Sequence, residues 1–118
     1  MSTDSSSASV PPEPAANQFA SIKLTMTEPD QEPREFKFSQ ARITFGREPS
    51  CDVVMNDEES SRQQCLIEFD EAGQPYLSDL LSTNGTWLGD ERVEREPLND
   101  GATFRVGKTH IRAELTSV

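Results

Sequence analysis

A chain of 118 residues is long enough for one domain with one modest hydrophobic core. Its 21 acidic and 11 basic residues give a formal net charge of −10, so long-range electrostatics repel nucleic acids and anionic membranes, and we expect neither as a partner. The two cysteines, Cys51 and Cys65, and the lone histidine, His110, do not have the spacing of a metal site. We therefore expect two free thiols, no metal and no cofactor.

The first 17 residues consist mostly of Ser, Pro and Ala and contain almost nothing to bury. We predict a disordered tail over residues 1–17, with a polyproline-like stretch at Val10–Pro14, and one domain over residues 18–118. The tail lacks the basic start and apolar run of a signal peptide. No segment approaches the ~20 apolar residues of a membrane span, so we expect a cytoplasmic protein that does not insert into membranes.

From residue 19 onward, apolar residues alternate with polar ones, which is the pattern of half-buried β-strands. The predicted strands fall at Phe19–Met26, Phe36–Phe38, Ile43–Phe45, Cys65–Phe69, Tyr76–Leu80, Phe104–Val106 and His110–Leu115. Turn signals separate them, at Glu28–Asp30, Glu48–Ser50, Asp70–Gly73, Asn84-Gly85, Leu88–Asp90 and Asn99–Gly101. Short strands about ten residues apart, with no helical stripe between them, predict an all-β sandwich or barrel.

The segment Asp79–Thr86 places small polar side chains directly after a short apolar run. Asn84-Gly85 accepts positive φ at both central positions of a tight turn, so we predict a tight turn between two strands there. The side chains of Ser82–Asn84 would then lie on a rigid, solvent-facing loop and present hydrogen-bonding groups to a ligand. The simpler interpretation is that this segment is a turn and nothing more.

Two further loops carry polar residues of the same kind. Gly46-Arg47 follows the predicted strand Ile43–Phe45, and Ser60-Ser61-Arg62 precedes the predicted strand Cys65–Phe69. Arginine presents a planar fork of donors to phosphate oxygens, and hydroxyl and backbone N–H groups can bond the remaining oxygens. Together with Ser82–Thr86, these loops predict a phosphate-binding site at one end of a β-sandwich.

The order of these motifs resembles that of the forkhead-associated (FHA) domain family, from about residue 20 to about residue 116. The resemblance rests on Gly46-Arg47, Cys51–Met55, Ser61-Arg62, Asp79-Leu80, Ser82–Thr86, Pro97–Gly101 and Val106-Gly107. It implies an FHA-type β-sandwich of about ten to eleven short, mostly antiparallel strands. It also implies a module that binds phosphothreonine peptides and is not an enzyme. Its partners would be phosphothreonine-containing proteins, substrates of a Ser/Thr kinase, in signalling or regulation.

The resemblance further implies a role for each motif residue. Arg47 would bond the phosphate from the loop after its strand, and Ser61 would hydrogen-bond a phosphate oxygen. Arg62, next to Ser61, would add a second cationic contact. Thr83 would offer its hydroxyl or amide to the phosphate, and Asn84 would bond the peptide backbone beside the phosphothreonine.

Arg62 has a second interpretation. The three carboxylates of Asp57–Glu59 lie close to it in the sequence. An ion pair with one of them on the surface would neutralise the arginine and contribute only about 0–1 kcal/mol.

Other residues are expected to shape the site. Gly46 and Gly85 would permit the turns, and Thr86 would open the next strand. The family has a histidine three positions after the serine, where this chain has Gln64. Gln64 offers a donor and an acceptor and would replace that histidine as a brace, or it would let the loop loosen and weaken binding. Gly89-Asp90 also stands where the family often has Asn-Gly.

Alternatives to a simple phosphopeptide reader follow from the same residues. Gln64 and the acidic run Asp57–Glu59 also fit an FHA-fold scaffold or assembly domain that binds its partners without phosphate. Some short bacterial FHA proteins are switched when a phosphorylated threonine of the N-terminal tail docks into the same site, and Thr3 is the threonine in this tail. An enzyme is disfavoured, because His110 lies late in a strand with no polar loop motif around it.

Overall fold

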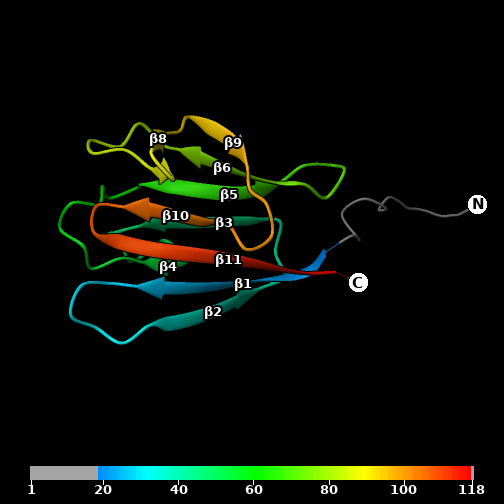
Figure 1. Cartoon of the computed structure of the whole chain (residues 1–118), viewed down its shortest axis with the longest axis horizontal. Coiled ribbons are helices and arrows are strands. Elements are labelled where there is room, and N and C mark those ends of the chain that lie inside the picture. Colours follow the sequence, from blue (N-terminus) through cyan, green and yellow to red (C-terminus); the bar gives the residue numbers. More distant parts are fainter. Residues whose placement is uncertain (1–18, 118) are drawn as a thin grey trace, which may run out of the picture.

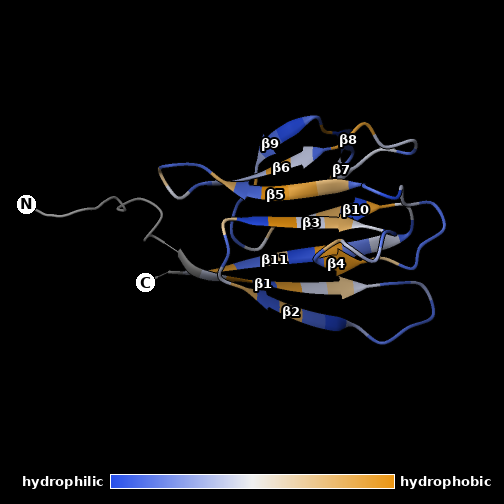
Figure 2. Cartoon of the chain, turned by 180° about the vertical axis from the view of Figure 1, so that it is seen from behind, coloured by the Kyte–Doolittle hydropathy of each residue, from blue (hydrophilic) through white to orange (hydrophobic). Residues whose placement is uncertain are grey.

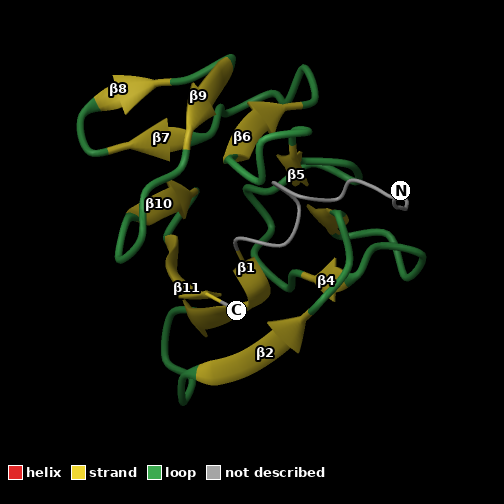
Figure 3. Cartoon of the chain, turned by 90° about the vertical axis from the view of Figure 1, so that its right-hand side faces the viewer, coloured by secondary structure: helices red, strands yellow, loops and turns green. Residues whose placement is uncertain are grey.

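The chain folds into two β-sheets. A computed structural model describes residues 19–117, and within this range it contains strands and loops but no helix (Figures 1 and 3). The six-stranded sheet has the order β2-β1-β11-β10-β7-β8, with β1 Phe19–Thr27, β2 Arg34–Phe38, β7 Trp87–Leu88, β8 Glu91–Arg92, β10 Thr103–Val106 and β11 Thr109–Ser117. The five-stranded sheet has the order β4-β3-β5-β6-β9, with β3 Arg42–Gly46, β4 Val53–Val54, β5 Cys65–Phe69, β6 Pro75–Asp79 and β9 Arg95–Pro97.

The strand pairs are antiparallel, apart from the parallel pair β3–β4. The predicted all-β sandwich of ten to eleven mostly antiparallel strands is therefore confirmed, with eleven strands. The predicted disordered tail and its Thr3 lie outside the described residues. No helix able to cross a membrane occurs between residues 19 and 117.

The hydrophobic core lies between the two sheets. Alternation puts one face of each strand inward, so that Ile22 and Leu24 of β1 are fully buried. Phe45 of β3 and Phe104 of β10 come from opposite sheets, and their rings pack edge to face with centroids 5.6 Å apart. Figure 2 shows a hydrophobic β5 in the middle of its sheet, whereas the edge strands β2 and β9 are mostly hydrophilic. One edge strand of each sheet is thus polar.

Four short strands do not follow from the sequence pattern. β4, β7 and β8 have two residues each, and β9 has three. A run of two or three residues is too short to show a period of two. All the longer predicted strands are present in the structure, with bounds that differ by a few residues.

The predicted tight turn between strands at Asn84-Gly85 is wrong. The strands on either side of this loop, β6 and β7, belong to different sheets, so the loop crosses between the sheets and does not join paired neighbours. A two-residue turn requires paired flanking strands. Within the loop, Leu81 and Gly85 have positive φ, 56° and 89°, and Asn84 does not.

We predict that Phe104→Ala lowers the free energy of unfolding by about 3–5 kcal/mol, because it opens a cavity at the contact between the sheets. Urea unfolding followed by Trp87 fluorescence measures the change. The half-buried Phe38 on the edge strand β2 provides the matched control, and Phe38→Ala is expected to cost less. Equal losses for the two variants would contradict a core centred on the Phe45–Phe104 contact.

Candidate functional site

The three loops predicted to carry the site meet at one end of the five-stranded sheet. Cys65, the first residue of β5, pairs with Phe45 near the end of β3 and with Asp79 at the end of β6. The loop after β3, the loop before β5 and the loop after β6 therefore leave the sheet together. The antiparallel register of β3, β5 and β6 thus explains why residues distant in the sequence become neighbours.

Backbone and side-chain hydrogen bonds connect these loops. The Arg47 backbone N–H donates to the Ser61 carbonyl oxygen at 3.1 Å, and the Thr83 N–H donates to Ser61 Oγ at 3.1 Å. Asn84 Nδ2 donates to the Glu59 carbonyl oxygen at 2.8 Å. The structure therefore brings together four of the five predicted ligand residues, Arg47, Ser61, Thr83 and Asn84, through direct contacts between the loops.

Gly46 permits the closest of these approaches. A Cβ atom at this position would lie 2.0 Å from the Arg62 carbonyl oxygen, which no side chain tolerates. The expectation that Gly46 permits a turn is wrong in its reason, because Gly46 does not have positive φ. Glycine is needed here because the loop before β5 lies directly on the end of β3.

Gln64 joins two of the loops from inside the protein. Its side chain is fully buried. Oε1 accepts a hydrogen bond from the Ser61 backbone N–H at 2.7 Å, while Nε2 donates to the Gly85 carbonyl oxygen at 2.9 Å and to Thr86 Oγ1 at 3.1 Å. One uncharged side chain thus links the loop before β5 to the loop before β7.

The loop between β6 and β7 is built around the carboxylate of Asp79, for which the sequence suggested no role. Oδ2 accepts from the Ser82 N–H at 3.0 Å, and Oδ1 accepts from Ser82 Oγ at 2.5 Å and Thr86 Oγ1 at 2.7 Å. Ser82 Oγ in turn accepts from the Gly85 N–H at 3.0 Å. An Asp followed by a Ser three residues later is a turn signal, since both side chains bond nearby backbone groups. Thr86 is fully buried and connects this network to Gln64.

The two predicted arginines are exposed, and neither forms an ion pair within residues 19–117. Arg47 Nε donates to the Ser60 carbonyl oxygen at 2.7 Å, and within residues 19–117 the two terminal NH₂ groups of this guanidinium make no further hydrogen bond. In the described part of the chain, the surface ion pair considered for Arg62 is not formed. Its side chain stays exposed beside Ser61.

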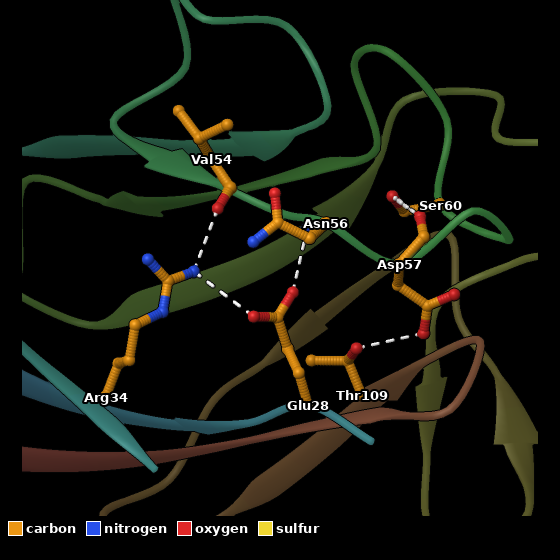
Figure 4. Close-up of polar contacts among 7 residues, drawn as sticks. All are labelled: Glu28, Arg34, Val54, Asn56, Asp57, Ser60 and Thr109. Carbon is orange, nitrogen blue, oxygen red and sulfur yellow. Dashed lines mark hydrogen bonds and ion pairs between the residues drawn. The ribbon is translucent and has the colours of Figure 1, made fainter. Parts of the chain in front are cut away.

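Asp57, the first of the three neighbouring carboxylates, bonds to other groups instead (Figure 4). Oδ2 accepts from the Lys108 backbone N–H at 2.8 Å and from Thr109 Oγ1 at 2.9 Å, and Oδ1 accepts from the Glu59 N–H at 2.9 Å. Burial raises the pKa of the Asp57 carboxyl. These hydrogen bonds and the Lys108 charge lower it by more than burial raises it, so the pKa lies below its usual value. The ionised carboxylate is therefore held by donors on another strand pair.

The two thiols are free, as expected. Cys65 is fully buried, and burial raises the pKa of its thiol far above the usual value. Burial also raises the pKa of the partly buried Cys51 thiol, and the nearby Glu48 carboxylate adds to this. Both cysteines are therefore packed side chains of low reactivity. Between residues 19 and 117 there is no group of three His, Cys, Asp or Glu side chains placed to hold a metal ion.

Comparisons with known proteins match the same region. The model of the FHA domain matches residues 43–107. Serine/threonine-protein kinase RAD53 of Saccharomyces cerevisiae is 40% identical over 68 residues, which are 54% of this chain and 8% of that protein. Glycogen accumulation regulator GarA of Mycolicibacterium smegmatis is 29% identical over 76 residues, which are 64% of this chain and 48% of GarA. The chain therefore spans less than half the length of either relative.

Solved structures have the same fold. One, from a structural and functional analysis of phosphothreonine-dependent FHA domain interactions, has a TM-score of 0.73 at 26% identity and covers 83% of this chain and 99% of that one. The FhaA FHA domain complexed with the intracellular domain of Rv3910 has a TM-score of 0.70 at 27% identity, covering 79% of this chain and 99% of that one. Because the family model matches more than half of the residues and the fold agrees over most of the chain, this protein belongs to the FHA domain family.

Proposed function

We propose that residues 18–118 form a phosphothreonine-peptide-binding module that mediates phosphorylation-dependent protein–protein interaction in signalling or regulation. Family membership and the phosphothreonine-dependent interactions studied in a structural neighbour support this function. The observation that carries it is the Thr83 N–H to Ser61 Oγ bond beside the exposed Arg47. Together with the bond from the Arg47 N–H to the Ser61 carbonyl oxygen, that contact connects three loops that carry a guanidinium and two hydroxyl side chains.

The hydrogen-bond donors that remain unused on these side chains suit a phosphate. A phosphothreonine carries about −1.5 to −2 charges and three acceptor oxygens. With Nε bonded to Ser60, the two terminal NH₂ groups of Arg47 can bond two phosphate oxygens end-on. Ser61 Oγ already accepts the Thr83 N–H, so its own proton can be donated to the third oxygen. Arg62 adds the second positive charge.

Asn84 suits the peptide backbone. Its Nδ2 donates one proton to the Glu59 carbonyl oxygen, which leaves Oδ1 and the second Nδ2 proton for a backbone N–H and carbonyl of the ligand. Two or three charge-assisted bonds of about 1.5–3 kcal/mol each, together with this contact, account for a micromolar Kd, about −8 kcal/mol. Asn84 would fix the register of the peptide, while Arg47 and Ser61 would hold its phosphate.

The partners that we propose are phosphothreonine-containing proteins, the substrates of a Ser/Thr kinase. The module would bind and not catalyse, so it would require no cofactor. Its free thiols, Cys51 and Cys65, fit a reducing compartment such as the cytoplasm. Docking of a phosphorylated Thr3 into the same site remains a proposal from the sequence, since Thr3 lies outside the described residues.

One observation favours a second function, that of a scaffold domain with phosphate-independent binding. The side chain of Leu81 is 98% exposed, and its φ is 56°, on the same loop as Thr83. A leucine held in this strained conformation in solvent is a candidate contact for an apolar partner surface. Salt and inorganic phosphate distinguish the two functions, because they weaken a phosphate contact and barely affect an apolar one.

We expect the isolated domain to bind a phosphothreonine peptide, selected from a peptide library, with micromolar affinity and its unmodified form at least about tenfold more weakly. The phosphoserine form lacks one methyl group, worth about 0.8 kcal/mol or roughly fourfold. Arg47→Ala is expected to remove most of the phosphate dependence in isothermal titration calorimetry. Arg42→Ala, at the other end of β3, makes the same charge change and is expected to bind like the wild type. Equal binding of phosphorylated and unmodified peptides would refute the proposed function.

A second prediction concerns Gln64 as the brace. Gln64→Leu leaves the Ser61 N–H and the Gly85 carbonyl without their buried partner, so we expect a loss of stability of about 1–3 kcal/mol. We also expect peptide affinity to fall, measured by calorimetry well below the unfolding temperature, because the loops lose their fixed separation. Gln64→His, which restores the family residue, is expected to keep the affinity within a few-fold. Wild-type affinity for Gln64→Leu would show that the ligand itself orders the loops.

A third prediction concerns the residues that flank the phosphothreonine. Residues 18–118 carry eleven basic and nineteen acidic side chains. The exposed Glu59 bonds Asn84 through its carbonyl oxygen, and the exposed Glu58 precedes it in the same turn. Each Lys or Arg in the ligand that reaches them should tighten binding about twofold to fivefold at low salt, and less at high salt. The charge reversals Glu58→Lys and Glu59→Lys should shift the preference to acidic flanks, since they leave the Glu59 carbonyl in place. An unchanged preference in the library screen would assign it to another surface.

A further inference from the structure

Two of the proposed ligand residues are held by the backbone of one turn, residues 57–60. Arg47 Nε donates to the Ser60 carbonyl oxygen at 2.7 Å, and Asn84 Nδ2 donates to the Glu59 carbonyl oxygen at 2.8 Å. These bonds determine which N–H groups of the Arg47 guanidinium and which atoms of the Asn84 amide remain for a ligand. The position of the turn therefore sets the direction of both side chains.

Asp57 holds this turn through both oxygens of its carboxylate and through its backbone carbonyl. Within the turn, Oδ1 accepts the Glu59 N–H at 2.9 Å, and the Asp57 carbonyl oxygen accepts from the Ser60 N–H at 3.0 Å and Ser60 Oγ at 2.6 Å. Outside it, Oδ2 accepts from the Lys108 N–H and from Thr109 Oγ1, at 2.8 and 2.9 Å. Lys108 and the fully buried Thr109 lie at the hairpin between β10 and β11 of the six-stranded sheet. A single carboxylate thus ties the turn to the opposite sheet (Figure 4).

The chain that enters the turn is held separately. Glu28, which is only 4% exposed, accepts from the Asn56 N–H at 2.8 Å and from Arg34 Nη2 at 3.3 Å, and Arg34 Nη2 also donates to the Val54 carbonyl oxygen at 3.1 Å (Figure 4). These bonds fix the residues before the turn. The carbonyl groups that hold the ligand residues lie between Asp57 and Ser61. Gln64 accepts the Ser61 N–H at 2.7 Å and holds the far end of the turn, so the Asp57 carboxylate is the contact that holds its near end.

We propose that Asp57 is a positioning residue for ligand binding: by tying the turn at residues 57–60 to the β10–β11 hairpin, it sets the direction of Arg47 and Asn84. This inference rests on the proposed phosphopeptide function for its effect on affinity. The effect on the two side chains exists in the ligand-free protein as well. The carboxylate itself does not contact the ligand.

Asp57→Asn tests the inference, because an amide cannot accept all three donors and must present an NH₂ group to one of them. Asp70→Asn is the matched control: Asp70 Oδ1 accepts the Ala72 and Gln74 N–H groups, both at 2.9 Å, in the hairpin at the other end of β5. We expect Asp57→Asn to weaken the selected phosphothreonine peptide about tenfold. Asp70→Asn should change the affinity less than about twofold, even where the two variants lose similar thermal stability.

A second readout reports the side chains directly. In ¹⁵N spectra of the ligand-free domain, the Arg47 Nε–H should be protected from solvent exchange, and the Asn84 amide protons should be distinct. Asp57→Asn is expected to speed exchange of the Arg47 Nε–H several-fold and to shift the Asn84 signals, while Asp70→Asn leaves both unchanged. Thr109→Val removes one of the donors to Asp57 and keeps the carboxylate, so it should give a smaller change in the same direction and serves if Asp57→Asn does not fold.

The outcomes separate this inference from the proposed function. If the wild type binds the phosphothreonine peptide but Asp57→Asn and Asp70→Asn weaken it equally, or if the Arg47 and Asn84 signals do not respond, the positioning role is refuted. If the wild type does not bind the peptide while the two signals still respond to Asp57→Asn alone, the proposed function fails and the positioning of Arg47 and Asn84 stands.

Discussion

The geometry of the site depends on the buried amide of Gln64. The Gln64 side chain is fully buried. It accepts one hydrogen bond from the Ser61 backbone and donates to Gly85 and Thr86, so it joins the loops that carry them. Because these partners lie on different loops, a relative movement of the loops would leave a polar group unpaired away from water, at a cost of about 1–3 kcal/mol. The loop before β5 and the loop before β7 are therefore held at a fixed distance from each other even without a ligand. A site that is already ordered loses less entropy when it binds.

A net charge of −10 is compatible with the proposed anion site, because within residues 19–117 no carboxylate forms an ion pair with Arg47 or Arg62. The carboxylate of Asp79 accepts from Ser82 and Thr86, and that of Asp57 accepts from Lys108 and Thr109. Both are held by neutral donors inside the fold. The guanidinium groups of the site are left without a carboxylate partner in the described structure, so their charge is available locally. For the proposed function, long-range repulsion would then act on the choice of ligand and disfavour acidic flanks.

The sequence predicted the strands that are long enough to alternate and the three polar loops that the structure brings together, because both are local or motif-based properties. It did not predict β4, β7, β8 or β9, whose two or three residues carry no period. The sequence shows the glycine at position 46 but not why a glycine is required there, because the Arg62 carbonyl that lies against it belongs to another loop. The contact of Asp57 with Lys108 spans 51 residues. Such partners become apparent only when the sheets are assembled.

The site belongs to both sheets, although its loops leave only one of them. β3, β5 and β6 supply the loop ends, whereas Lys108 and Thr109 of the six-stranded sheet hold Asp57. The separation of the sheets is set by core contacts such as that between Phe45 and Phe104. Gln64 fixes two loops relative to each other, and Asp57 fixes one of them relative to the far sheet. With both constraints, the loop before β5 has two fixed points on different elements. The proposed orientation of Arg47, which bonds the Ser60 carbonyl of this loop, rests on them.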